Sequence, residues 1–262
     1  MYASSAAHYL RGRPPYSAQL LDVLRDELDL DGTGLLVDVG CGPGVLVVQL
    51  APAVATRIGI DPEPAMLDEA ASHAAAHDVE AQWICARAEY LPALDLPPAR
   101  LVTFGQSLHW TDQEPVIDAV YDLLEPGGAI AVIAHDIEAG PSPIDAPAPP
   151  IPHDEIHALI RRHLANDSAP RPARMDRFED ALTRSRFGTS RHVLAPGRTD
   201  LVRSADDVIA NFFSTSFAAP DLFGAGLDAF VADMRDVLAT SSPTGRFWDW
   251  PGDTAVVLAV KR

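Results

Sequence analysis

The strongest chemical signal in the chain is a glycine-rich run at residues 38–44, which reads Asp-Val-Gly-Cys-Gly-Pro-Gly. It follows the apolar residues 35–37 and precedes residues 45–50, which we expect to start a helix. Glycines let the backbone turn sharply and let a ligand approach without meeting a Cβ atom. The first amides of a helix also lack partners within that helix. The run therefore predicts a ligand-binding loop between a buried strand and a helix.

A second acidic residue, Asp61, ends the next predicted strand at residues 57–61. In doubly wound α/β folds an acid at this position binds the hydroxyls of an adenosine ribose. A dinucleotide site requires G-x-G-x-x-G, and here Val45 and Val47 stand where the third glycine belongs in each frame. The pattern therefore indicates a nucleoside ligand and disfavours a nicotinamide-dependent oxidoreductase.

The elements that must position these residues alternate along the first half of the chain. Short apolar runs predict strands, and segments with helical periodicity lie between them. This alternation is typical of a parallel sheet covered by helices on both faces. Strands are predicted at residues 35–39, 57–61, 82–85, 101–104, 129–134, 190–194 and 254–260, and helices at 17–30, 45–50, 65–77, 156–164, 178–182, 206–213 and 227–238.

The fold class predicted is α/β, with a Rossmann-like, seven-stranded, mostly parallel sheet, an antiparallel C-terminal strand and a helical cap insertion. We expect a single domain over residues 1–262, because the last strand returns to the sheet. The proline-rich residues 141–152 indicate an extended loop or linker. The expected parts are N-terminal cap helices (1–30), a cofactor-binding core (31–136), a substrate-side cap (137–187 and 206–238) and C-terminal strands of the sheet (188–205 and 246–262).

The composition excludes several functional classes. A formal net charge of −17 disfavours a nucleic-acid partner, because affinity for phosphate backbones comes largely from Lys and Arg. No apolar run approaches the roughly 18 residues of a membrane span, and residues 1–13 lack the apolar region of a signal peptide. The only cysteines, Cys41 and Cys85, form neither a disulfide framework nor a zinc motif. We therefore expect a cytoplasmic protein without membrane partners.

The glycine-rich run also has the form D-x-G-x-G-x-G, and this form resembles motif I of class I S-adenosylmethionine-dependent methyltransferases, in the small-molecule (type 11-like) branch. The resemblance extends in order over residues 9 to 135. It comprises the N-terminal cap of that branch (9–16), the ribose-binding strand end (59–67), the adenine-side loop (85–92), the strand-four motif that faces the transferred methyl (101–110), and the turn and strand that follow (123–134).

The resemblance implies S-adenosyl-L-methionine as cofactor and assigns residues to each part of it. The implied cofactor contacts are Tyr9, Arg13, Asp38, Gly40, Cys41, Gly42, Gly44, Asp61, Pro62, Met66, Ala88, Glu89, Gln106 and Ser107. Among them, Asp38 and the glycines serve the methionine end, and Asp61 serves the ribose. Many members of the family have an acid at the position of Arg87, and that acid accepts a hydrogen bond from the adenine amino group. Arg87 cannot take this role, because a guanidinium accepts no hydrogen bond. The backbone around Ala88, or Glu89, is then expected to recognise adenine.

The methyl-transfer chemistry points to His109. A sulfonium methyl is already electrophilic, so the protein must chiefly align the acceptor and remove its proton where one is lost. An imidazole titrates near neutral pH, which makes His109 the candidate base, although His109 and Trp110 are also interpretable as packing. Tyr16, His109 and Trp110 are the expected substrate contacts. Tyr9 and Tyr16 have an alternative interpretation, in which they pack the N-terminal helix.

Other chemically capable residues have weaker interpretations. His153 and His157 are four residues apart, which places two imidazoles on one helix face. No third ligand is in register, so we predict no metal site and favour a solvated lid surface. The phenylalanines of residues 212–223 are interpreted as hydrophobic core.

The sequence thus predicts methyl transfer from S-adenosylmethionine to a small molecule. The resemblance suggests an aromatic or heterocyclic natural product in specialised metabolism, and it leaves C-, N- and O-methylation open. An alternative is a protein of the same fold that binds the cofactor and acts as a cyclase or partner protein without methyl transfer. Nothing in the sequence indicates the oligomeric state.

Overall fold

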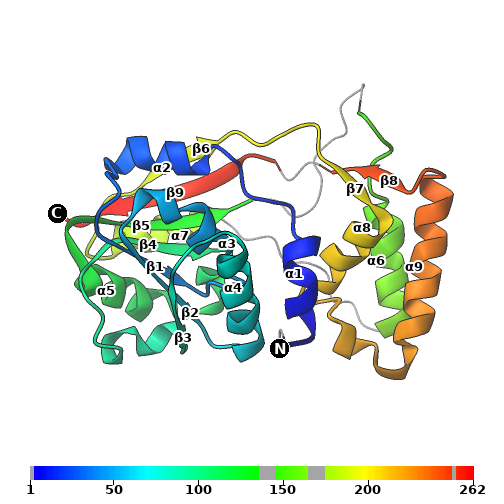
Figure 1. The fold of residues 1–262 in the computed structure, drawn as a ribbon, viewed down its shortest axis with the longest axis horizontal. Helices are drawn as coiled ribbons and strands as arrows, with labels where there is room; N and C mark the ends of the chain where they lie inside the picture. The colour runs from blue at the N-terminus through cyan, green and yellow to red at the C-terminus, as the bar shows by residue number, and fades with distance from the viewer. Residues whose placement is uncertain (1–2, 136–145, 165–174, 250–251) are drawn as a thin grey trace. The chain divides into compact units, whose positions relative to one another are not determined.

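The structure, a computed structural model, describes residues 3–135, 146–164, 175–249 and 252–262 (Figure 1). The chain divides into two compact units, each assembled from three stretches. The sheet unit comprises Ser17–His135, Ala173–Pro196 and Thr254–Arg262. The helical unit comprises Met1–Tyr16, Asp136–Pro172 and Gly197–Asp253. No helix among the described residues is long and apolar enough to cross a membrane.

A seven-stranded sheet forms the centre of the sheet unit. Its strands follow the order β3-β2-β1-β4-β5-β9-β6, and β9 is antiparallel to both of its neighbours while the other pairs are parallel. This arrangement confirms the predicted fold class. The strands are β1 Leu35–Val39, β2 Thr56–Asp61, β3 Gln82–Cys85, β4 Ala99–Gly105, β5 Leu124–Ala134, β6 Arg191–Ala195 and β9 Thr254–Val260.

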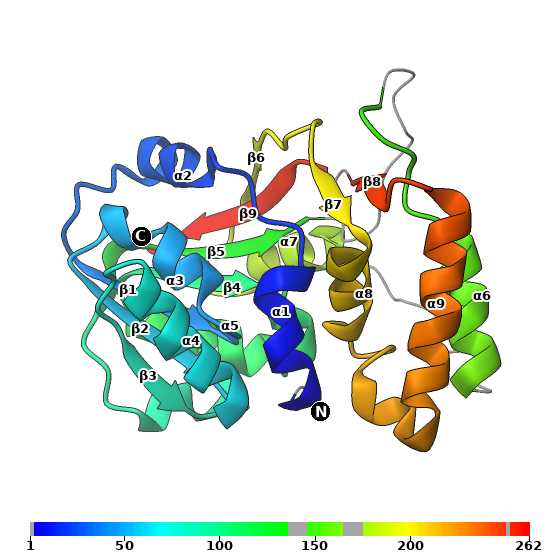
Figure 2. The same ribbon diagram turned by 45° about the vertical axis from the view of Figure 1, so that its right-hand side comes forward.

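Helices cover both faces of this sheet. Every residue of β1 is buried, as expected for a central parallel strand packed on both sides. One face carries α5 and α7, whose apolar residues join those of the strands in a single core cluster. The other carries α3 and α4, which lie side by side in Figure 2. The helices of this unit are α2 Leu20–Leu28, α3 Val45–Gln49, α4 Pro64–Ala76, α5 Gln113–Leu123 and α7 Met175–Arg184.

Short 3-10 helices follow two of the parallel strands. Ala88–Ala93 follows β3 and Leu108–Trp110 follows β4, so both belong to connections at the carboxyl edge of the sheet. In parallel sheets the loops at this edge form the ligand site. The remaining 3-10 helices are Ala3–Ser5, Ala51–Ala53, Pro220–Leu222 and Gly224–Gly226.

The helical unit has a separate hydrophobic core. Ile156, Phe212, Phe230, Met234 and Phe247 belong to one buried cluster, so the core interpretation of Phe212 is confirmed. The helices of this unit are α1 Ala6–Gly12, α6 His153–Leu164, α8 Ala205–Phe213 and α9 Leu227–Ser241. Its strands β7 Val202–Ser204 and β8 Arg246–Trp248 pair with each other as a two-stranded sheet.

The predicted boundaries of the cap differ from the structure in two places. The sequence predicts residues 137–187 as cap, whereas α7 packs on α5 and β9, and its Phe178 and Leu182 are buried in the core of the sheet unit. Residues 202–204 and 246–248 were predicted as strands of the main sheet, whereas they form the separate β7–β8 pair. Residues 141–145 of the predicted proline-rich loop lie outside the described residues.

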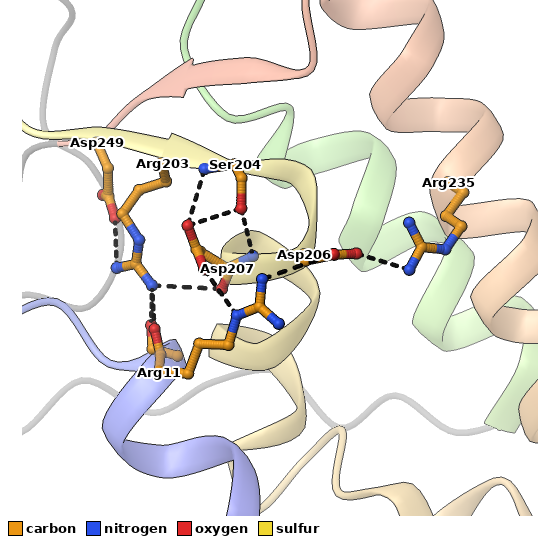
Figure 3. Close-up of polar contacts among 8 residues, drawn as sticks. Arg11, Arg203, Ser204, Asp206, Asp207, Arg235 and Asp249 are labelled. Atoms are coloured by element: carbon orange, nitrogen blue, oxygen red, sulfur yellow. Dashed lines mark hydrogen bonds and ion pairs between the residues drawn. The ribbon is translucent and has the colours of Figure 1, made fainter.

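Within the helical unit, α1 packs closely on α8. A Cβ atom added to Gly12 would lie 2.3 Å from the backbone carbonyl of Ala210, so only glycine permits this approach. The guanidinium of Arg203 donates to the carbonyls of Arg11 and Gly12, at 2.8 and 2.6 Å, and thereby holds the carboxyl end of α1 (Figure 3). The same group pairs with Asp249 at 3.4 Å.

Both members of the Arg203–Asp249 pair are buried. Burial lowers the pKa of Arg203 and raises the pKa of Asp249, while the attraction between the two charges opposes both shifts. A buried ion pair of this kind is costly to break by removing one partner, because the other charge is left uncompensated.

We therefore expect Asp249→Ala to lower the free energy of unfolding by about 3–5 kcal/mol, as measured by urea denaturation followed by circular dichroism. Asp200→Ala is the matched control. It removes the partner of Arg198 from an exposed ion pair that water already screens, so its unfolding should change little. Equal losses of unfolding free energy in the two variants would show that the buried pair contributes no more to stability than the exposed pair does.

Candidate cofactor site at the carboxyl edge of the sheet

The glycine-rich loop leaves the end of β1 and is tied to β2. The amides of Gly40 and Cys41 both donate to the carbonyl of Ile60, at 2.7 and 3.0 Å. Gly40, Gly42 and Gly44 all have positive φ angles, of 68°, 50° and 74°. These conformations strain residues with a side chain, which explains why glycine stands at all three positions.

The surroundings of the three glycines differ. A Cβ atom on Gly40 would lie 2.5 Å from the Cβ atom of Ser107, and one on Gly44 would lie 2.7 Å from the indole of Trp83. A Cβ atom on Gly42 would meet no atom within 4 Å. The loop is therefore packed against protein at Gly40 and Gly44 and open at Gly42, which is the position where a ligand can approach the backbone.

Asp61, at the end of β2, bridges this loop to the next helix. Its Oδ2 atom accepts from the amide of Gly42 and its Oδ1 atom accepts from the amide of Glu63, both at 2.9 Å. Burial raises the pKa of Asp61, and the two amide hydrogen bonds oppose that rise. Each carboxylate oxygen has a second acceptor position. The residue can therefore hold the loop and still accept hydrogen bonds from two ribose hydroxyls.

Residues next to Asp61 set the start of α4. Pro62 is exposed in the turn, and Met66 is buried in the first turns of the helix. Pro64 occupies the first helical position, where its fixed φ suits a helix start and its missing amide costs no hydrogen bond. A cofactor contact by Pro62 or Met66 stays a prediction.

Asp38 lies in β1 and is 2% exposed. The hydroxyl of Thr103 on β4 donates to its Oδ1 atom at 2.7 Å. Burial raises the pKa of Asp38 to about 7; the hydrogen bond from Thr103 lowers it, and the nearby charge of Asp61 raises it further. A buried carboxylate in this state gains stability from a cation, so the site fits the ammonium group of a methionine moiety. Thr103 was not identified from the sequence.

The predicted adenine side is the 3-10 helix Ala88–Ala93. Ala88 is buried, and the amide of Ala86 donates to the carbonyl of Asp61 at 3.2 Å, which ties this loop to the ribose side. Glu89 accepts from the amide of Asp112 at 3.2 Å and from Arg87 at 3.3 Å. The hydrogen bonds and the Arg87 charge lower the pKa of Glu89 although its burial raises it. Arg87 thus interacts with the neighbouring acid.

The segment after β4 has an unusual backbone. Gln106 has a φ of 57°, and its side chain donates to the carbonyl of His135 at 2.6 Å. The hydroxyl of Ser107 donates to the carbonyl of Val39 at 2.6 Å, next to the glycine-rich loop. Both side chains therefore shape the turn between β4 and the 3-10 helix Leu108–Trp110, a role that the sequence did not reveal. A cofactor contact by either residue stays a prediction.

His109 and Trp110 are both exposed beyond this turn. Their rings lie 5.0 Å apart at 42°, and Trp110 is 53% exposed. This exposure is incompatible with the interpretation that Trp110 fills core space. The pair therefore offers an aromatic face and an imidazole together at the carboxyl edge of the sheet.

Three predicted contacts belong to the helical unit, namely Tyr9, Arg13 and Tyr16. Arg13 donates to the carbonyl of Ser214 at 3.0 Å, and its guanidinium lies 5.1 Å from the centre of the Tyr9 ring. These contacts hold Arg13 within the helical unit. Any contact of the three residues with the cofactor or acceptor stays a prediction.

The histidine pair predicted to form a solvated lid surface instead packs against an aromatic side chain. His153 and His157 are half-buried on α6, with ring centres 5.9 and 5.7 Å from that of Phe212. Apolar packing at the helix face thus replaces the predicted solvation. Across the described parts of the chain, no group of three or more His, Cys, Asp or Glu residues has the arrangement of a metal site.

Comparison with known proteins agrees with this geometry. Residues 36–128 match the family model described as a methyltransferase domain. An uncharacterized methyltransferase of Mycobacterium bovis is 30% identical over 132 residues, which make up 50% of this chain and 51% of that protein. The chain thus spans about half the length of the curated relatives it matches.

Two solved structures share the fold at low identity. A methyltransferase from Thiobacillus denitrificans, solved with S-adenosyl-L-homocysteine, is 16% identical with a TM-score of 0.54, and the match covers 100% of this chain and 97% of that one. The 4+2 cyclase SpnF is 18% identical with a TM-score of 0.52, and the match covers 93% and 81%. The domain match and the shared fold lead to one conclusion: residues 36–128 match a methyltransferase domain, and the chain has a fold that a solved S-adenosylmethionine-dependent methyltransferase shares.

Proposed function

We propose that this protein transfers the methyl group of S-adenosylmethionine to a small molecule. One observation carries the proposal. The Asp61 carboxylate accepts the Gly42 amide at the point where the glycine-rich loop faces open space, so a ribose acceptor and an uncovered backbone lie together. The buried Asp38 supplies the second requirement, a carboxylate for a cationic group. Together the two acids fit the ribose and the ammonium group of this cofactor.

The bound cofactor supplies an electrophilic methyl group, and the chain binds and orients it. In this proposal Asp38 holds the ammonium, Asp61 holds the ribose hydroxyls, and the backbone at Ala88 with Glu89 recognises adenine. Gly40, Cys41, Gly42 and Gly44 line the methionine end through their backbone. Gln106 and Ser107 hold the turn that faces the methyl group.

On the acceptor side we assign Trp110 as a wall and His109 as the base. The exposed Trp110 ring suits stacking against a flat acceptor, since aromatic pairs gain stability beyond area burial alone. His109 lies beside it and takes the proton that an oxygen, nitrogen or carbon nucleophile loses on attack. Tyr16 is assigned to the same acceptor. An aromatic or heterocyclic natural product of specialised metabolism fits these residues best.

The charge and the cysteines support the remaining assignments. A net charge of −17 opposes binding to polyanions, which favours a small acceptor over a nucleic acid. Cys41 and Cys85 are both free thiols, in keeping with the reducing environment of the cytoplasm.

A second function is supported by one comparison. The cyclase SpnF shares the fold, so a chain with this architecture can serve chemistry other than methyl transfer. In that case the cofactor site would support binding while no methylated product forms. Detection of a methylated acceptor separates the two functions.

The decisive experiment is calorimetric titration of the protein with S-adenosylhomocysteine, with NAD as control. Selective binding supports the cofactor site and justifies screening acceptors with labelled S-adenosylmethionine. Absence of binding, both alone and with an acceptor mixture, overturns the proposal.

Asp61→Ala should weaken S-adenosylhomocysteine binding by about 1.5–3 kcal/mol, or roughly ten- to a hundredfold in Kd, because a charged acceptor is lost. Calorimetry measures the change. Asp68→Ala on the exposed face of α4 is the matched control and should bind as the wild type does. Unchanged affinity in Asp61→Ala would rule out the ribose assignment.

The pKa of Asp38 predicts a pH dependence. Because it is raised to about 7, Asp38 is largely protonated in the free protein below that pH and must ionise to pair with an ammonium. The affinity for S-adenosylhomocysteine should therefore rise with pH up to about 7 and level off above it, with proton release on binding below pH 7.

The raised pKa of Asp38 has the opposite effect on the stability of the free protein, which decreases as the pH rises. The folded state binds the proton more tightly than the unfolded state, whose Asp38 titrates near 3.8, so the free energy of unfolding falls as pH rises from 3.8 to about 7. Calorimetry and urea unfolding across this range test both effects. Asp38→Asn should remove the Asp38 component of each. A wild-type binding profile that is flat with pH contradicts the assignment.

His109→Ala should slow methyl transfer by about a hundredfold or more if the imidazole acts as base. His77→Ala, which removes an exposed histidine at the end of α4, is the control and should retain the wild-type rate. A wild-type rate at every pH in His109→Ala would assign this residue to packing.

A further inference from the structure

Trp83 lies in the middle of β3 and is paired in register with Gly59 of β2. Alternation along the strands places the side chains of Ile58, Ile60 and Ile84 toward the core shared with α5. Trp83 therefore projects from the opposite face, which carries α3 and α4. There it packs against the cluster of Cys41, Val47 and Leu67.

The indole occupies space that two glycines leave free. A Cβ atom on Gly59 would lie 2.3 Å from Cζ3 of Trp83 and 2.9 Å from Sγ of Cys41. A Cβ atom on Gly44 would lie 2.7 Å from Cη2 of the same indole and 3.2 Å from Cβ of Ala70. The ring is thus half-buried against β2, α4 and both Cys41 and Gly44 of the glycine-rich loop.

The loop needs this support because its own residues provide little. Its three glycines have positive φ angles and no side chains, so their backbone has many alternative conformations. Hydrogen bonds to Ile60 and Asp61 hold Gly40, Cys41 and Gly42 on the side of β2. On the face of the sheet that carries α3 and α4, the rigid indole of Trp83 packs against Cys41 and Gly44.

We propose that Trp83 is a positioning residue for the cofactor loop. Its indole packs against Cys41 and Gly44 and restricts their positions. The Gly42 amide therefore keeps its hydrogen bond to Asp61, and the loop is already in its binding conformation before the cofactor arrives. The inference rests on the proposed function, since it concerns the same cofactor site. Preorganisation of this kind increases affinity by reducing the ordering that binding requires.

Trp83→Leu should therefore weaken S-adenosylhomocysteine binding by about tenfold or more, while Trp83→Phe, which keeps a flat ring, should restore most of the affinity. Phe178→Leu is the matched control, because it removes a buried aromatic ring from α7 on the opposite face of the sheet. It should lower the unfolding midpoint and leave the affinity unchanged. Wild-type affinity in Trp83→Leu overturns the proposal.

A second substitution tests the contact itself. Gly59→Ala should reduce both the affinity and the unfolding midpoint, because its Cβ atom displaces the indole. In the Trp83→Leu background, Gly59→Ala should reduce the affinity and the unfolding midpoint much less, since the obstructing ring is gone. Gly226→Ala is the control glycine, as its Cβ atom would meet nothing within 4 Å. Additive effects of the two substitutions contradict the proposal.

Hydrogen exchange separates this inference from the proposed function. Trp83→Leu should speed amide exchange at Gly40, Cys41, Gly42 and Gly44 and leave exchange in α7 unchanged, and this readout needs no cofactor. If the wild type does not bind S-adenosylhomocysteine, the proposed function fails while faster exchange still supports loop positioning. If the wild type binds and exchange at residues 40–44 is unaltered by the substitution, the positioning role fails alone.

Discussion

Asp61 accepts two backbone amides, and the one from Gly42 joins the ends of the neighbouring strands β1 and β2 into one site. Without the Gly42 bond, the hydrogen bonds that tie the glycine-rich loop to β2 would be those to the carbonyl of Ile60. Because the acceptor is a carboxylate, the hydrogen bonds to Asp61 are stronger than hydrogen bonds between neutral groups. We propose the same carboxylate as the ribose ligand, and under that proposal loop geometry and cofactor recognition depend on a single side chain.

This arrangement places two acids in a poorly solvated edge of the sheet. The pKa values of Asp38 and Asp61 are both raised, chiefly by burial, and the charge of Asp61 contributes to the shift at Asp38. Buried like charges destabilise the free protein, and a cationic ligand offsets that cost. Raised pKa values are common at functional sites for this reason. The local instability of the acids is therefore consistent with a binding role.

The helical unit differs in how its buried charges are compensated. There the buried charge is compensated from within the protein, since Arg203 pairs with Asp249 and also satisfies the last carbonyls of α1. A positive group at the carboxyl end of a helix also interacts favourably with the helix dipole. The short helix α1 is thus held by contacts with its own unit, notably the close approach of Gly12 to α8.

The sequence by itself determined the binding loop, the acid at the end of β2 and the order of strands and helices. These features are local: a positive φ requires glycine, and a buried parallel strand requires an apolar run. The tertiary structure decided which surfaces meet. An amphipathic α7 does not specify which core it covers, and Trp83 and Gly59 become partners only when β3 pairs with β2. The pKa of Asp38 likewise follows from its burial beside Thr103, because solvent exclusion is a property of the packed structure.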